Sequence, residues 1–210
     1  MGVKERKERE FKRREGEILG AALKLLDGED WLSVTIEQIA DAAEVGKGTV
    51  YKHFASKDEL YARLSLHHYL ELQGALSELD AEMPIEARLR AMAQVYWDVH
   101  MKPGICHHVV EYCEAEAFRS QLPPEVRSEF EGVESGIYDQ IYGAIEEGMA
   151  EGLFPTGPLP PLAMLARATL DGMIRLIRTG VLSAEDESEQ LEMVTRFIMA
   201  GLAASATPSR

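Results

Sequence analysis

The feature that most constrains this 210-residue chain is a pair of short amphipathic segments separated by a tight turn, between residues 35 and 54. Thr35 stands three residues before Gln38, the spacing of a capping box, in which a hydroxyl and an amide satisfy backbone N–H groups at the start of a helix. The first segment has an apolar face formed by Ile36, Ile39, Ala40 and Ala43. A turn at 44–46 leads into the second segment, at 47–54. The pattern predicts two short helices joined by a compact turn.

The flanking segments predict two longer helices. Apolar residues recur at helical spacing in the first, which predicts a helix of about 17 residues that stops at Asp27-Gly28. Its apolar positions are Phe11, Ile18, Ala22, Leu25 and Leu26. Ser56 and Glu59 repeat the capping-box pattern and open a long helix that runs through Leu72. A long helix followed by two short ones is the helix-turn-helix arrangement, whose second short helix enters the major groove of DNA.

The second short segment carries side chains that suit contact with DNA. Lys47 and Gly48 stand at its N-terminus, where free N–H groups and the helix dipole favour phosphate. Thr49 offers a hydroxyl and a methyl group to base edges, while Tyr51 and His53 reach phosphate oxygens. Positive charge on either side comes from Lys52 and Lys57. The residues predicted to form the core between the helices are Val45, Val50 and Phe54.

From Thr35 to Leu60, the motif resembles the N-terminal DNA-binding domain of TetR-type transcriptional regulators; the matching run is Ala43-Glu44-Val45-Gly46-Lys47-Gly48-Thr49-Val50-Tyr51-Lys52-His53-Phe54. The resemblance implies an all-α homodimer that binds palindromic operator DNA and has a larger C-terminal domain for ligand binding and dimerisation. It implies a DNA-binding domain at 12–72, with the helix-turn-helix at 35–54, and a C-terminal domain at 73–210. By position it places at or near DNA the residues Thr35, Lys47, Gly48, Thr49, Tyr51, Lys52, His53 and Lys57.

Two positions depart from the family pattern. Glu44 stands where the family usually has Gly in the turn, and a left-handed backbone at a non-glycine residue costs about 1 kcal/mol. Gly46 stands where a Ser or Thr cap is common, and this change costs only about a few tenths of a kcal/mol. Glu44 also adds negative charge beside the groove, so we expect it to reduce the affinity for DNA.

The net charge of −14 argues against a protein that coats nucleic acid through bulk charge. The charge is uneven, however, because residues 1–60 hold 11 basic and 13 acidic side chains whereas residues 61–210 hold 11 and 23. The first 14 residues hold seven basic and three acidic side chains. The acidity therefore belongs to the C-terminal part. The basic start is either a solvated helix end or a contact for DNA phosphates.

The C-terminal part predicts a helical bundle. Pro84 is expected at the first position of one helix, and the longest helix covers the near-heptad run from Val126 to Met149. A stiff Pro-rich linker is expected at 156–161, followed by two helices with broad apolar faces rich in Ala and Gly. These last two helices form either an ordinary intrachain core or a dimer interface. The dimer is favoured because one recognition helix reads few base pairs.

A ligand-binding regulator needs a pocket that is mostly apolar with a few convergent polar groups. By residue type and position, the candidates are Tyr96, His100, Tyr112, Cys113, Tyr138 and Met173. A soft-metal site at 106–108 with Cys113 is disfavoured, because neighbouring helical residues point about 100° apart. Cys106 and Cys113 lie too far apart on one helix for a disulfide, at about 10 Å between Cα atoms. We expect no metal and no cofactor.

The sequence contains no P-loop, nucleophile elbow or metalloprotease motif, so an enzyme is not expected. No apolar run is long enough for a membrane span, and the charged N-terminus excludes a signal-peptide core, so the expected location is the cytoplasm. The leading hypothesis is a dimeric repressor that a small hydrophobic effector releases from operator DNA. Two alternatives are a helical ligand- or partner-binding protein that keeps the motif as scaffold, and a helical enzyme acting on an apolar substrate.

Overall fold

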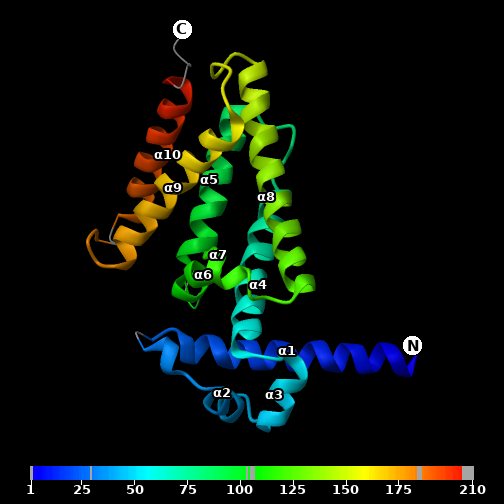
Figure 1. Cartoon of the computed structure of the whole chain (residues 1–210). Helices are drawn as coiled ribbons and strands as arrows, with labels where there is room; N and C mark the ends of the chain where they lie inside the picture. Colours follow the sequence, from blue (N-terminus) through cyan, green and yellow to red (C-terminus); the bar gives the residue numbers. More distant parts are fainter. Residues whose placement is uncertain (1, 29, 103, 105–106, 184–185, 205–210) are drawn as a thin grey trace. The chain divides into compact units, whose positions relative to one another are not determined.

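The computed structural model of the chain describes residues 2–28, 30–102, 104, 107–183 and 186–204. All regular secondary structure in these ranges is helical, which confirms the predicted all-α class (Figure 1). The chain forms two compact units. Unit 1 consists of Met1–His68 and Pro103–Glu131, and unit 2 of Tyr69–Lys102 and Gly132–Arg210. The predicted division into 12–72 and 73–210 stays a prediction.

Unit 1 begins with α1, Val3–Leu26. This helix begins well before Phe11, the first residue of the apolar stripe that predicted it. At its start the Gly2 N–H donates a hydrogen bond to the Glu5 carboxylate at 2.8 Å, and further along Arg13 forms ion pairs with Glu10 and Glu17, each one turn away. The basic N-terminal arm is therefore a helix with exposed side chains. The rest of the unit contains η1 (Trp31–Ser33), α2 (Ile36–Ala42), α3 (Lys47–His53), the start of α4 (Lys57–Ser77), α6 (His107–Glu114), α7 (Glu116–Arg119) and the start of α8 (Pro124–Ala150).

The predicted capping box opens α2. The Thr35 hydroxyl accepts a hydrogen bond from the Gln38 N–H at 3.2 Å, and the Gln38 side-chain oxygen accepts one from the Thr35 N–H at 2.8 Å. At the start of α4, Ser56 accepts from the Glu59 N–H at 3.0 Å, while Glu59 reaches the N–H of Ala55 instead of that of Ser56. Local side-chain chemistry therefore sets both helix starts.

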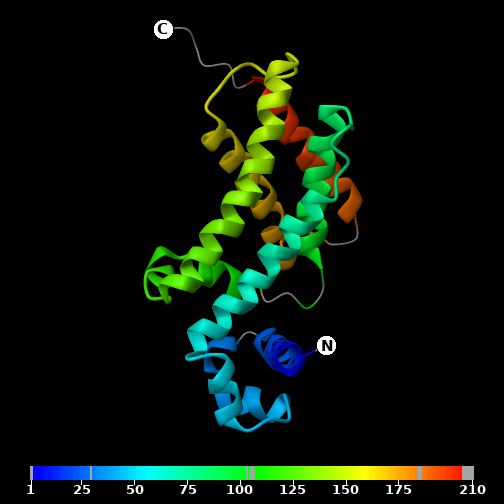
Figure 2. The ribbon, with the colours of Figure 1, turned by 90° about the vertical axis from the view of Figure 1, so that its right-hand side faces the viewer.

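Unit 2 contains the rest of α4 and α8 together with α5 (Ile85–Met101), α9 (Leu159–Arg178) and α10 (Glu187–Ala204). Helices α5, α9 and α10 pack against one another (Figures 1 and 2). As predicted, α8 is the longest helix described, with 27 residues. Pro84 was predicted as the first residue of a helix but is the N-cap of α5, so the helix begins one residue later than predicted. No helix in the described ranges has both the length and the apolar character needed to cross a membrane.

The prediction of a linker running to Pro161 is wrong, because α9 begins at Leu159. Pro160 and Pro161 occupy the first turn of the helix, where backbone N–H groups have no intrahelical acceptor. The missing N–H of proline therefore costs nothing there, and its fixed φ favours the helical backbone.

The end of α8 packs closely on the loop that follows it. The Phe154 ring is buried with Leu162 and Leu202, and it lies against the backbone of Gly148. A Cβ atom added at Gly148 would lie 2.7 Å from the ring, closer than packed atoms allow. At Gly143 in the same helix, an added Cβ meets nothing within 4 Å.

We predict that Gly148→Ala lowers the free energy of unfolding by about 1–3 kcal/mol, because the buried Phe154 ring has to move. Gly143→Ala is the matched control and raises it by about 0.5–1 kcal/mol, as expected for Gly to Ala in an open helix position. Urea unfolding followed by circular dichroism measures both. Equal effects of the two substitutions would contradict the close packing at Gly148.

Candidate functional site

The exposed face of α3 carries four of the eight residues that the sequence predicts at DNA. Val50 is fully buried, and this anchors the helix in unit 1. Lys47, Gly48, Tyr51 and Lys52 are exposed around it, with Tyr51 48% exposed. A tyrosine ring held at the surface by a buried neighbour is available for contact with a partner. These four residues are therefore accessible on the surface of unit 1, and their contact with DNA stays a prediction.

Two of the residues predicted to contact DNA, Lys57 and His53, instead contact other residues of unit 1. Lys57 Nζ donates a hydrogen bond to the Leu32 carbonyl at 2.7 Å and lies 5.3 Å from the centre of the Tyr61 ring. Burial lowers the pKa of Lys57. The His53 ring stacks on Phe11 of α1 with centroids 4.0 Å apart, and burial lowers the pKa of His53. A neutral, stacked His53 is better suited to fixing α3 against α1 than to attracting phosphate.

The remaining predicted residues lie near the start of α3. Lys47 lies 3.7 Å from a carboxylate oxygen of Glu37 in an exposed ion pair. Such a pair contributes little to stability, so phosphate can replace it readily. Thr35 is exposed at the N-cap of α2, and Thr49 is half-buried on α3.

The turn between α2 and α3 has the left-handed backbone considered for Glu44, whose φ is 54°. The turn is closed by the Val45 N–H, which donates to the Ala40 carbonyl at 2.9 Å. Within the described residues, Glu44 is the sole non-glycine residue with positive φ. The strain is therefore confined to the point that sets the angle between α2 and α3.

We predict that Glu44→Gly raises the free energy of unfolding by about 1 kcal/mol, because glycine adopts positive φ without steric cost. Glu44→Gln keeps the strained backbone and removes only the charge, so it should leave stability within about 0.5 kcal/mol of the original. Thermal and urea unfolding test both variants. If Glu44→Gln stabilises as much as Glu44→Gly, charge and not backbone strain is responsible.

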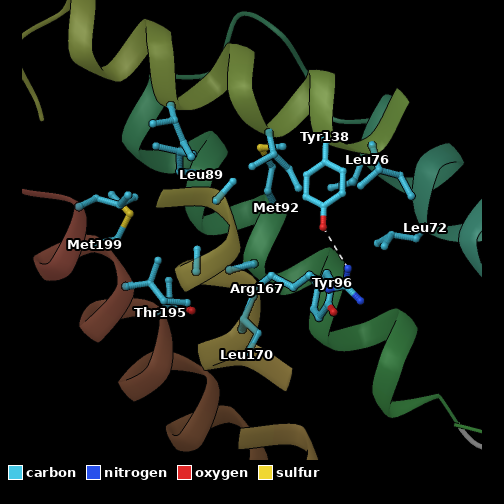
Figure 3. Close-up of a pocket in the computed structure, with 18 of the residues that line it drawn as sticks. Leu72, Leu76, Leu89, Met92, Tyr96, Tyr138, Arg167, Leu170, Thr195 and Met199 are labelled. Atoms are coloured by element: carbon cyan, nitrogen blue, oxygen red, sulfur yellow. Dashed lines mark hydrogen bonds between the residues drawn. The ribbon is translucent and has the colours of Figure 1, made fainter. Parts of the chain in front are cut away.

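Unit 2 encloses a cavity lined by side chains of α4, α5, α8, α9 and α10 (Figure 3). Most of the lining is Leu, Ile, Met and Ala; the polar members are Tyr69, Tyr96, Glu134, Tyr138, Arg167 and Thr195. The centres of water-sized molecules fit in about 90 Å³ of it. The free space is therefore narrow and mostly apolar, as expected for a site that binds a small hydrophobic molecule.

A hydrogen-bonded chain of four side chains lies along one part of the cavity. Arg167 Nη1 donates to the Tyr138 hydroxyl at 3.0 Å (Figure 3), and Arg167 Nε lies 3.3 Å from one oxygen of Asp171. The other oxygen of Asp171 accepts from the Tyr96 hydroxyl. Burial, followed by the negative charge of Asp171, raises the pKa of Tyr96 well above its usual value. Tyr96 is therefore a neutral hydrogen-bond donor.

The six predicted ligand residues are not all at this cavity. Tyr96 and Tyr138 line it. His100 stacks on Tyr96 at 3.9 Å, and burial lowers its pKa to about 4, so the ring is neutral at pH 7. Met173 is half-buried on α9 and is not part of the lining. Tyr112 and Cys113 belong to unit 1, where Tyr112 packs on Trp31 and burial raises the pKa of Cys113 to about 12.

Nothing in the sequence pattern singled out Arg167, Asp171 or Glu134. The one available signal was the spacing of Arg167 and Asp171, four residues apart on a helix, which is also the spacing of ordinary surface ion pairs. In the region considered for a metal, His108 hydrogen-bonds through Nε2 to the Leu26 carbonyl and His107 packs against His68. Cys106 lies outside the described residues.

The structure combines a helix-turn-helix, with its second helix exposed, and a helical unit that contains an apolar cavity. These features define an all-helical protein with a helix-turn-helix in one unit and a mostly apolar cavity in the other. Residues 18–64 match the family model for bacterial regulatory proteins of the tetR family. The matched segment contains the helix-turn-helix, and solved structures of TetR-family regulators share the fold of the chain.

Curated relatives include the HTH-type transcriptional regulator HbdR of Aromatoleum sp. (strain CIB), 30% identical over 100 residues, or 48% of this chain and 37% of that protein. The HTH-type transcriptional repressor NicS of Pseudomonas putida is 25% identical over 65% of this chain and 64% of its own length. The chain thus matches less than two thirds of the length of each of these relatives.

Solved structures share the fold over nearly the whole chain. A protein of unknown function from Rhodococcus sp. RHA1 has a TM-score of 0.72 at 22% identity, covering 90% of this chain and 95% of that one. The TetR family transcriptional regulator PfmR from Thermus thermophilus has a TM-score of 0.69 at 19% identity, covering 92% of this chain and 99% of that one.

Proposed function

We propose that the protein is a transcriptional repressor that binds a palindromic operator as a dimer and is released by a small hydrophobic effector. The observation that carries this proposal is the exposed face of α3, with Lys47, Tyr51 and Lys52 around the buried Val50, within the segment that matches the TetR family model. The proposed site of action is the cytoplasm, where the DNA would be accessible.

The charge distribution supports contact through unit 1. The start of α1 carries seven basic side chains among the first 14 residues of the sequence, against three acidic ones, and all seven except the half-buried Arg14 are exposed. Positive charge on an exposed helix attracts DNA phosphates regardless of base sequence. The strongly acidic remainder discourages nonspecific binding, so binding should depend on the correct placement of few basic groups.

Exposed apolar side chains on α9 and α10, and just after α9, support dimerisation; they are Met164, Leu165, Leu176, Val181, Met193 and Phe197. Leu165 is 65% exposed and Phe197 is 69% exposed. Apolar surface on two neighbouring helices is costly in water and is typical of an interface. A two-fold dimer then presents two copies of α3 to two half-sites about one helical turn apart.

The cavity of unit 2 supports regulation by a small molecule. A ligand shifts a two-state equilibrium only through different affinities for the two states. In the proposed mechanism, the ligand-bound state separates the two recognition helices by a distance that no longer fits the operator. Helices α4 and α8 each contribute residues to both units.

The alternative is a helical ligand- or partner-binding protein that keeps the motif as scaffold. The observation that favours this alternative is Glu44, which adds a negative charge to the turn before α3. Salt dependence separates the two proposals, because genuine phosphate contacts produce a linear fall of log affinity with log salt.

We predict that Lys47→Ala weakens binding to an operator chosen from a random DNA library and reduces the salt slope by about one per protomer. Tyr51→Phe should weaken binding about three- to tenfold at constant slope, because it removes one hydrogen-bonding hydroxyl. Lys102→Ala, in unit 2, removes the same charge as Lys47→Ala and should leave the slope unchanged. Fluorescence anisotropy over a salt series measures all three.

Circular dichroism spectra of the variants should match that of the original protein. A wild-type affinity that does not change with salt would favour the scaffold alternative. Equal effects of Lys47→Ala and Lys102→Ala would show that general charge, and not the helix-turn-helix, drives binding.

We predict that Phe197→Glu converts the dimer to a monomer, because a charge placed on an apolar interface has to be desolvated. Affinity for the full palindrome should fall by at least about tenfold, while affinity for a half-site stays the same. Leu70→Glu is the control, since Leu70 is an exposed apolar residue of unit 2 on α4. Light scattering after size exclusion measures the mass. A dimeric Phe197→Glu protein would contradict the interface.

A further inference from the structure

The polar part of the cavity restricts the chemistry of its ligand. Figure 3 shows the Tyr138 ring among the lining residues, with its hydroxyl directed at Arg167. That hydroxyl accepts a hydrogen bond from Arg167 and directs its own proton at the thioether sulfur of Met164, 3.3 Å away. Sulfur is a weak acceptor. A ligand oxygen near Tyr138 would therefore be a better partner for this proton than the one it has.

The charge of the ligand is restricted as well. Arg167 lies directly beside Tyr138, so a cationic group bound there would be repelled by the guanidinium. Glu134 lines the cavity, and the Arg167 guanidinium is already paired with Asp171, so an anionic group would meet one carboxylate and a guanidinium whose charge is already balanced. Either charge would also lose its hydration in a mostly apolar space. A neutral group avoids repulsion by the guanidinium, repulsion by carboxylate and the loss of a charged group's hydration.

The remainder of the cavity matches an alkyl or other apolar body. Its walls are side chains such as Leu72, Leu89, Met92, Ile141 and Met199. Burial of each methylene group there contributes about 0.8 kcal/mol. Affinity should therefore come from the apolar body, and orientation from one hydrogen bond.

Building on the proposed effector-binding function, we propose that the cavity selects an uncharged apolar molecule with one acceptor oxygen, which accepts a hydrogen bond from the Tyr138 hydroxyl. Alcohols, ketones and esters with an apolar chain belong to this class. Carboxylates and amines with the same chain are excluded by the paired charges of Arg167 and Asp171.

The test uses the purified full chain and three probes that share one alkyl chain: 1-octanol, octanoate and octylammonium. Isothermal titration calorimetry at pH 7 measures their dissociation constants. We expect 1-octanol to bind at least about tenfold more tightly than either ion, because only the ions lose strong hydration. Tyr138→Phe should weaken octanol binding about three- to tenfold through loss of one hydrogen bond.

Tyr142→Phe is the matched control for the same chemical change. Tyr142 stacks on Tyr138, with centroids 5.6 Å apart, but does not line the cavity, so octanol binding should be unchanged. Tighter binding of octanoate or octylammonium, equal binding of all three probes, or no saturable binding of octanol would each overturn the inference. So would equal effects of the two tyrosine variants.

The salt dependence of DNA binding without any probe is measured separately. A protein that binds DNA but fails the probe series would overturn only the ligand class. A protein that passes the probe series but shows no salt-dependent DNA binding would overturn the proposed repressor while leaving the cavity chemistry intact.

Discussion

The helix-turn-helix depends on burial, because its two helices are too short to be stable alone. Helices α2 and α3 have seven residues each, well below the length at which isolated helices persist in water. Burial of Ile39, Val50 and Phe54 supplies the missing stability. It also determines orientation: with Val50 facing the core, the neighbouring Tyr51 has to face solvent. The same packing that stabilises the motif presents its proposed contact surface.

Much of this arrangement could be predicted from the sequence because its causes are local. The capping box at Thr35 and the end of α1 at Leu26 follow from side chains within one turn of the helix end. Apolar spacing was also sufficient to predict α8. It could not locate the start of α1, where Glu5 caps the Gly2 N–H and there is no apolar stripe, nor the start of α9, where prolines resemble a linker but occupy a helical turn.

The candidate sites were harder to predict because they depend on contacts between distant segments. Tyr96 and Tyr138 have residue types common in pockets, whereas Arg167 and Asp171 have the spacing of a surface ion pair. Similarly, His53 has a side chain suited to phosphate, but its stacking on Phe11 depends on where α1 passes α3. The association of α6 with unit 1 also has no local signal. The net charge of −14 had suggested a poor DNA binder, but the distribution of that charge along the chain favours DNA contact through unit 1.

A DNase footprint on the DNA upstream of the protein's own gene tests the central claim, sequence-specific binding by a dimer, most directly. We expect two protected half-sites whose centres lie about one helical turn, roughly 34 Å, apart on the same face of the DNA. Protection should be lost as the salt concentration rises. No protected site at low salt, or uniform protection along the fragment, would contradict sequence-specific binding by a dimer.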